Sequence, residues 1–332
     1  MATSRIKGVN EQISTYGASG FGRDYTSLST WEAATDNNLV SLAQSEVLEC
    51  YDDAAQFDDR TSMAGATTNA SYRRIIRPAG SRFGSDWQGH KGVVPGPGVT
   101  FTRASGIGFE ISGEDYASIQ DLIMSAVDND TNETTGGDNT TWIGIINIDC
   151  LGRGFNMSDG ADGVVVNCLC INQDEHPFLG DIDDCYFLNC TALDSVIGRG
   201  FNEFSVDPIW INDLADGNFD DDFDGGSAFL EENNASGDAT AFGTGSRINQ
   251  TFTFQAHGSI EKGRLSITDA GARNYGQDLS AHSVFPFDDD IKWRRRVAAF
   301  DWDIGCDQYF SIYPVIDSLP GGSLNFGRRI VR

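Results

Sequence analysis

The chain has 332 residues, and its 49 acidic and 23 basic side chains give a formal net charge of −26. This excess argues against a nucleic-acid phosphate backbone as a partner, and no apolar stretch predicts membrane insertion or a signal peptide. The 38 glycines and only four methionines favour strands and turns over helices, so we expect an acidic all-β protein made without a signal peptide.

The N-terminal segment, residues 1–36, predicts an arm followed by one short helix. Ser29 and Glu32 have the spacing of a capping box, in which the two side chains bond backbone N–H groups at the start of a helix. Trp31 and Ala34 give this helix an apolar side. We expect the helix to cover the open end of the structure that follows.

A repeated motif runs through residues 37–205. Aligning VVVNCLC with YFLNCTA places the Asn167-Cys168 pair over the Asn189-Cys190 pair, an offset of 189 − 167 = 22 residues. The Asp149-Cys150 pair lies 18 residues before the first of these, and the Asp121-Leu122 pair lies a further 28 residues earlier. We expect the polar stretch DNDTNETTGGDNTT in that longer interval to loop out. Short strands at such a period bury their apolar faces by stacking coil on coil, so the repeat predicts a solenoid.

Seven cysteines leave one over in any set of disulfides, which disfavours a disulfide framework. A zinc site is the alternative for the cluster Cys168, Cys170, His176, Cys185 and Cys190. Its spacing does not fit, because Cys168 and Cys170 are too close for two ligands of a zinc knuckle. We therefore predict that the cysteines are small apolar core residues.

Residues 206–265 show no clear repeat and predict an irregular acidic insertion or lateral module. The stretch DDDFDGGSAFLE fits the calcium-loop pattern D-x-D-x-D-G-x5-E. The oxygen ligands of this candidate calcium site would come from Asp220, Asp222, Asp224, the carbonyl group of Gly226, and Glu231. A solvated acidic loop without metal is the alternative.

Two basic stretches stand out at the C-terminal end, KWRRR at 292–296 and GRRIVR at 327–332. We expect residues 266–310 to form closing coils and residues 311–332 to form a tail that contains an interface. The basic groups either pair with carboxylates of the same chain or dock the tail on an acidic face of a neighbouring subunit.

Three segments resemble the pectin-lyase-like class of right-handed parallel β-helix proteins, in the form found in phage and environmental sequences. They are the N-terminal stretch RDYTSLSTWEAATDNNLV with EVLECYDD, the repeats from FEISGEDYASIQDLIM to NCTAL, and the closing stretches ITDAGARNYGQDLS and DWDIGCDQY. The resemblance covers roughly residues 20–310. It implies a right-handed parallel β-helix with a short N-terminal capping helix and an irregular C-terminal region.

The resemblance leaves two functions open, since this fold serves unrelated activities. The first is a non-enzymatic component of a virus or phage particle, such as a tail fibre, a tailspike-like protein or a capsid-decorating protein. Such a protein would assemble in the host cytoplasm as a homo-oligomer, for example a trimer. Its partners would be other virion proteins and a host-surface glycan or receptor.

The second function is a polysaccharide depolymerase, a glycoside hydrolase or lyase. Glycoside hydrolysis needs two carboxyl groups that flank the sugar bond. Asp174, Asp183 and Asp184 vaguely resemble the acidic motifs of polygalacturonases, but the Gly-His and Arg-x-Lys motifs of that family are absent. Arg199 is the nearest candidate for the arginine base of a lyase. We prefer the non-enzymatic function.

Overall fold

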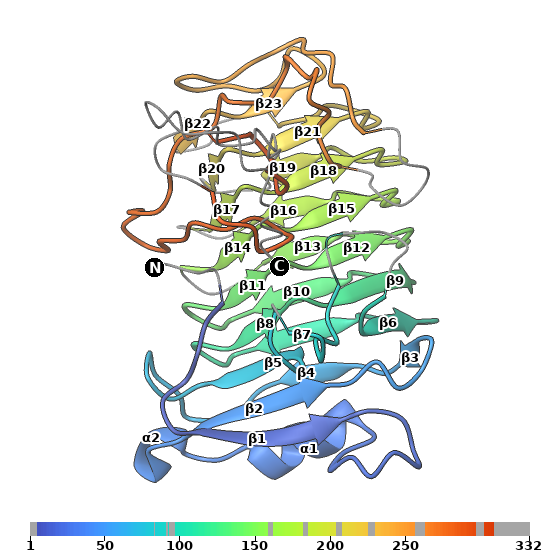
Figure 1. Cartoon of the computed structure of the whole chain (residues 1–332), viewed down its shortest axis with the longest axis vertical. Coiled ribbons are helices and arrows are strands. Elements are labelled where there is room, and N and C mark those ends of the chain that lie inside the picture. The colour runs from blue at the N-terminus through green and yellow to red at the C-terminus, as the bar shows by residue number, and fades with distance from the viewer. Residues whose placement is uncertain are drawn as a thin grey trace, which may run out of the picture.

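The computed structural model describes residues 5–82, 84–90, 92, 97–158, 162–181, 185–203, 208–224, 230–255, 263–296 and 302–308. Within these ranges the chain is nearly all β and forms a solenoid of parallel sheets, which confirms the expected fold class (Figure 1). The coils stack from α1 (Leu28–Thr35) and α2 (Leu39–Leu42) at the N-terminal end to β23 (Ala235–Ser236) at the other.

The described strands belong to three sheets, and from β2 to β21 successive strands of the chain visit the three sheets in turn. The nine-stranded sheet contains β1 (Glu11–Tyr16), β2 (Ser45–Cys50), β5 (Arg74–Pro78), β8 (Ser118–Gln120), β11 (Thr141–Ile143), β14 (Val164–Val166), β17 (Tyr186–Leu188), β20 (Ile209–Ile211) and β22 (Leu230–Glu232). The six-stranded sheet contains β4 (Thr61–Met63), β7 (Phe109–Ser112), β10 (Asn132–Thr135), β13 (Phe155–Met157), β16 (Phe178–Gly180) and β19 (Phe201–Glu203). The eight-stranded sheet contains β3 (Phe57–Asp58), β6 (Thr100–Arg103), β9 (Ile123–Val127), β12 (Ile146–Ile148), β15 (Leu169–Ile171), β18 (Thr191–Leu193), β21 (Leu214–Asp216) and β23.

The predicted coil offset of 22 residues is confirmed between 167 and 189. Strand β14 pairs with β17, and β15 pairs with β18, so the Asn-Cys pairs between these strands occupy equivalent places in adjacent coils. Asn167 and Asn189 have φ of 53° and 54°, in the left-handed region that asparagine tolerates better than most residues. The conformation lets the chain turn sharply from one sheet to the next.

The expected register of the Asp149-Cys150 pair is wrong. These residues follow β12, and β12 pairs with β15. The Asp149-Cys150 pair therefore aligns with the Asn172-Gln173 pair, which follows β15, and not with the Asn167-Cys168 pair, which precedes β15. The true equivalent of the Asn167-Cys168 pair is the Gly144-Ile145 pair. Gly144 has φ of 62°, and glycine adopts this conformation without an asparagine or aspartate to mark the turn. Because Gly144 does not resemble asparagine, the sequence alignment used the Asp149-Cys150 pair, which lies in the next turn of the same coil.

The polar stretch expected to loop out also lies within a regular coil. Residues 132–135 of DNDTNETTGGDNTT form β10, which pairs with β7 on one side and β13 on the other. Asn132 and Thr134 are fully buried despite their polarity. The side-chain NH2 group of Asn132 donates to the backbone carbonyl of Gly154 at 3.1 Å, so a polar residue occupies an inward position without breaking the strand.

Aromatic rings stack along the interior of the solenoid. Phe178 lies parallel to Phe155 and Phe201 at centroid distances of 5.2 and 4.7 Å, and Phe201 continues the stack to Phe223 at 4.8 Å. In-register parallel strands place like residues above one another, which creates this ladder.

The cysteines are core residues, as predicted. All seven are buried with free thiols, and burial raises the pKa of Cys170 and Cys190 well above the usual range. One coil beyond Cys190, the same inward position holds Asp213, whose backbone N–H bonds the side chain of Asn234 in the next coil.

Helix α1 covers the N-terminal end of the solenoid, but the expected capping box is wrong. The helix begins at Leu28 after Ser27, and the Leu28 N–H donates to the carboxylate of Asp59 at 2.8 Å. Trp31 is fully buried, as expected, whereas Ala34 is exposed. A carboxylate from the turn between β3 and β4 therefore bonds the start of the helix, a partner that local sequence spacing does not reveal.

At the other end, the coils continue through β20 to β23, beyond the expected limit at residue 205. Residues 263–296 and 302–308 contain no helix or strand, and we call them the strap. The strap runs back along the outside of the solenoid (orange to red in Figure 1). Its apolar side chains cover the nine- and eight-stranded sheets, with Phe287 and Trp302 in one cluster and Ile291 and Ile304 in another. The strap thus lies on the outside, where closing coils were expected.

Candidate functional site

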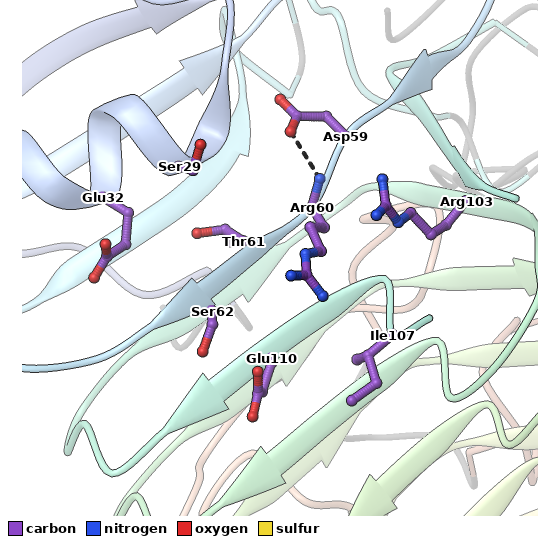
Figure 2. A pocket seen from close by; sticks show the side chains of 9 residues that line it. All are labelled: Ser29, Glu32, Asp59, Arg60, Thr61, Ser62, Arg103, Ile107 and Glu110. Atoms are coloured by element: carbon purple, nitrogen blue, oxygen red, sulfur yellow. Dashed lines mark hydrogen bonds between the residues drawn. The ribbon is translucent and has the colours of Figure 1, made fainter. Parts of the chain in front are cut away.

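A polar pocket lies between α1 and the first strands of the six-stranded sheet (Figure 2). Its volume is about 400 Å³. Residues from four separate segments line it: Ser29, Glu32, Asp59, Arg60, Thr61, Ser62, Arg103, Ile107 and Glu110. Coil closure brings these segments together, and the lining consists almost entirely of hydroxyl, carboxylate and guanidinium groups.

Asp59 organises the wall of this pocket. Its carboxylate accepts hydrogen bonds from the N–H groups of Leu28 and Arg60, each at 2.8 Å, and from the hydroxyl of Tyr16 at 3.1 Å. Burial, followed by the charge of Asp59, raises the pKa of Tyr16, so this phenol stays a donor. Asp59 therefore fixes the position of α1 relative to β4.

A buried ion pair supports the floor beneath the helix. Arg74 is fully buried and donates from Nε to Glu114 at 2.8 Å, and its Nη1 lies 3.4 Å from the Glu32 carboxylate. On the opposite wall, Arg103 pairs with Asp58 at 3.4 Å and donates to the Ser105 carbonyl. Charged groups on both walls are thus held in place by other parts of the chain.

Arg60 differs from the other charged groups of the lining. Its backbone N–H is bonded to Asp59, but within the described residues its guanidinium has no carboxylate within 4.0 Å. Figure 2 shows the guanidinium among Thr61, Ser62 and Glu110. A free guanidinium offers five N–H donors to an incoming acceptor.

The pocket continues as a stripe on the outer face of the six-stranded sheet. Ser62, Glu110, Glu133 and Asn156 occupy the same register position in β4, β7, β10 and β13. Asn156 donates to Glu133 at 3.2 Å and to the carboxylate of Asp130 at 2.9 Å. Burial, and then the charges of Asp130 and Glu110, raises the pKa of Glu133. The pairing of β7 with β10 places Glu110 and Glu133 one coil apart, so two carboxyl groups lie side by side on this face.

Two arginines lie at the edge of this stripe. Arg153 lies 3.5 Å from Asp130 and 3.4 Å from Glu175. Arg199, the candidate lyase base, pairs with Asp224 at 2.6 Å, and its backbone N–H donates to Nδ1 of His176 at 3.0 Å. These contacts give Arg199 and His176 structural partners within the chain.

Of the three predicted catalytic aspartates, the structure describes Asp174. Asp174 is half-buried in the turn after β15, where its backbone bonds Cys150 and Ile197. Its carboxylate makes no hydrogen bond or ion pair to any other described residue. Asp183 and Asp184 lie outside the described residues, so their part of this assignment stays a prediction.

The candidate calcium ligands have separate partners in the structure. The Asp222 carboxylate accepts from the Gly237 N–H at 2.7 Å and from the Asn218 amide at 2.8 Å, while Asp224 binds Arg199. Glu231 accepts from the Phe242 N–H at 3.0 Å, and burial raises its pKa to about 7.

Asp220 lies in the same turn, and Gly226 falls in 225–229, outside the described residues. Within the described ranges, no three His, Cys, Asp or Glu side chains are arranged to hold a metal ion. Calcium binding by the complete loop stays a prediction.

Sequence reasoning missed Glu110 and Glu133, although a signal was present. The two residues are 133 − 110 = 23 residues apart, close to the coil period, and each lies between inward residues in the stretches FEIS and NETT. The Asn-Cys repeat marks turns, whereas Glu110 and Glu133 recur at nearly the same period within strands. Arg60 had no sequence signal, because only coil closure places it beside residues 103–110.

No helix in the described part of the chain combines the length and apolarity needed to cross a membrane. Comparisons of the chain with protein-family models, with curated proteins and with solved structures found no match.

Proposed function

We propose that this protein is a non-enzymatic glycan-binding β-helix that serves as a component of a virus or phage particle. The pocket beside α1 and the stripe that continues from it carry the glycan-binding part of this proposal. Both present hydroxyl, amide, carboxylate and guanidinium groups, which supply the donors and acceptors that sugar hydroxyls need. Strands hold the groups of the stripe at a fixed spacing, so an extended ligand would meet a preorganised surface.

The particle part of the proposal rests on the resemblance of the N-terminal, repeat and closing segments to phage-type β-helix proteins. The strongly acidic chain is also expected to stay soluble before assembly. Its proposed partners are further copies of itself, other virion proteins and a host-surface glycan. Labelling intact particles with an antibody against this chain tests this part, and particles that carry no label would contradict it.

Glycan binding is tested with a variant that fills the pocket. Ser62 is exposed in the middle of β4 and lines the pocket, so Ser62→Trp adds an indole to the pocket without disturbing the core. On an array of bacterial and host glycans, we expect the wild-type protein to bind a restricted set and Ser62→Trp to lose that binding. Thr30→Trp is the control, because Thr30 is exposed on α1 but does not line the pocket. Equal binding by all three proteins would exclude this pocket.

A second candidate function, polysaccharide depolymerase, is favoured by one observation. Glu110 and Glu133 lie side by side on the sheet face, and burial raises the pKa of Glu133, which suits a proton donor beside a second carboxyl group. If the protein shortens a glycan that it binds, and Glu133→Gln abolishes this turnover while Asp128→Asn preserves it, the enzymatic function replaces the non-enzymatic one. Loss of turnover in Asp183→Asn, with Glu133→Gln active, would instead support the sequence-based assignment.

A further inference from the structure

A second pocket, of about 360 Å³, lies beside β11 and β14 of the nine-stranded sheet. Three parts of the chain form it. They are the N-terminal arm with Lys7, the turns that precede β5 and β8 with Arg73 and Tyr116, and the strap with Phe285. None of these residues lines the pocket beside α1. The two pockets therefore share no lining residue, and a ligand can bind the second without the first.

Two cations line this pocket without a carboxylate partner. Within the described residues, neither Arg73 nor Lys7 has an Asp or Glu oxygen within 4.0 Å. Arg73 donates to the carbonyl of Ala70, but its Nε is buried without an acceptor. Burial lowers the pKa of Arg73, and no carboxylate offsets this effect, since the opposing influence comes from Tyr116. The chain has more than twice as many acidic as basic residues. A half-buried guanidinium without a carboxylate partner is therefore unexpected in it.

Tyr116 supplies an independent sign of function at the same place. Its φ is 54°, a left-handed conformation that is costly for a large aromatic residue. In the next two coils the equivalent positions hold Asn139 and Asp162, which tolerate this conformation and have φ of 55° and 56°. The tyrosine therefore occupies a turn position for which the fold favours asparagine. Its ring lies in the pocket beside Arg73, whose guanidinium carbon is 5.8 Å from the ring centroid.

The remaining wall residues indicate the rest of the ligand. Tyr116 and Phe285 offer flat apolar faces, whereas Asn139 and Asp162 offer acceptors for hydroxyl groups. Asp162 forms no ion pair with either of the two cations. A ligand that fits these groups therefore combines one oxyanion with a ring that has both apolar faces and hydroxyl groups.

We propose that this pocket binds a sugar that bears a single oxyanion, a phosphate, sulfate or carboxylate, with Arg73 and Lys7 holding the oxyanion and Tyr116 contacting the ring. A guanidinium binds such groups through paired, charge-assisted hydrogen bonds. The bound anion would also offset the uncompensated charge of Arg73, so binding would stabilise the folded chain.

The test is calorimetric titration of the full chain at constant ionic strength, with glucose 6-phosphate, glucose 6-sulfate, glucuronate, inorganic phosphate and glucose as probes. We expect at least one charged sugar to bind more tightly than inorganic phosphate, and glucose not to bind. Arg73→Gln should weaken binding of that sugar by about tenfold or more, and Lys7→Gln should weaken it less, because Lys7 is exposed. Arg295→Gln, which removes an exposed guanidinium that lines neither pocket, is the matched control and should leave the affinity unchanged.

Tyr116→Asn separates binding from folding. Asparagine suits the left-handed backbone, so this variant should melt at the same temperature as the wild type or higher, yet bind the charged sugar more weakly. If no charged probe binds up to about 10 mM, or if Arg73→Gln and wild type bind equally, the proposal is wrong. If inorganic phosphate binds as tightly as every charged sugar, the pocket is a simple anion site and the sugar part of the proposal fails.

Discussion

At the residue scale, one turn position between sheets requires a particular backbone conformation of its residue and no side-chain contact. Asn189 has φ of 54°, and neither polar atom of its side chain has a partner in the described structure. Gly144 occupies the equivalent place two coils earlier. The position therefore requires a left-handed conformation and does not require an amide. The sequence marks such turns only where asparagine or aspartate occupies them.

We predict that Asn189→Gly leaves the free energy of unfolding within about 0.5 kcal/mol of wild type, whereas Asn189→Ala lowers it by about 1 kcal/mol. Alanine has a Cβ that clashes in the left-handed region, and glycine has none. Urea unfolding of the three proteins measures the difference. Equal stability of the alanine and glycine variants would show that backbone conformation does not select this residue.

Asp213 is a second residue whose position has an energetic consequence. Its carboxyl is fully buried in line with Cys190, accepts the Cys190 N–H at 2.6 Å and leaves Oδ2 without a partner. Burial raises the pKa of Asp213 well above its usual range, so the folded chain favours the protonated carboxyl. An aspartate in the unfolded chain ionises near about pH 4, so the folded state loses stability at this site as the pH rises above that value.

Asp213→Asn should therefore stabilise the protein at neutral pH, by about 1–3 kcal/mol, and should have little effect near about pH 3.5, where both states hold the proton. The amide keeps an acceptor for the Cys190 N–H, and Asn234 already occupies the equivalent position one coil on. Melting temperatures at both pH values measure the effect, with the exposed Asp128→Asn as control. A lower melting temperature of Asp213→Asn at neutral pH would contradict the assignment of a neutral, buried carboxyl.

At the element scale, the strands could be predicted better than their connections. The Asn-Cys repeat gave the correct period, because turn residues and small core residues recur wherever β14, β15, β17 and β18 stack. The register failed at Gly144, and the stretch containing β10 resembled a loop because its inward residues are polar. The pocket beside α1 could not be predicted, because it depends on the distances in space between α1, β3 and β4. Local sequence patterns do not encode these distances.

The aromatic ladder links strands that are far apart in sequence, so its removal affects several coils. Phe178 has a ring stacked on each side and is fully buried. We expect Phe178→Ala to lower the free energy of unfolding by about 3–5 kcal/mol, because it leaves a cavity between two rings. Chemical denaturation measures this loss. Phe219→Ala is the control, since Phe219 is 68% exposed and its truncation should cost less than about 0.5 kcal/mol.

At the scale of the whole molecule, the strap connects coils that do not otherwise touch. Arg82 donates from Nη2 to Asp121 of the solenoid at 2.7 Å, and its Nη1 lies 3.3 Å from Asp289 of the strap. Trp293 of the strap also donates to Asp121, at 3.1 Å. Further along, the Asn167 amide donates to the backbone carbonyl of Asp289. The lateral contacts therefore include a buried ion network as well as the apolar clusters.

Arg82→Met should loosen the strap, because it removes the guanidinium that bridges the buried carboxylates of Asp121 and Asp289. We expect a loss of about 3–5 kcal/mol and faster hydrogen exchange in residues 287–296, with little change in the six-stranded sheet on the far face. Arg295→Met is the control, since Arg295 is 63% exposed and its pair with Asp288 contributes about 0–1 kcal/mol. Unchanged exchange in the strap of Arg82→Met would show that the apolar clusters alone hold it.

The strap also limits how this molecule can change its length over evolution. It bonds Asp121 through Trp293 and Thr191 through the N–H of Cys306, two points separated by three coils. Duplicating one coil between them would move these points apart by about 4.8 Å, while the strap would keep its own length. A solenoid without a strap can gain or lose repeats by unequal recombination, whereas here the fixed length of the strap sets the number of coils between its two contacts. Changes in coil number are therefore expected only outside the coils between Asp121 and Thr191.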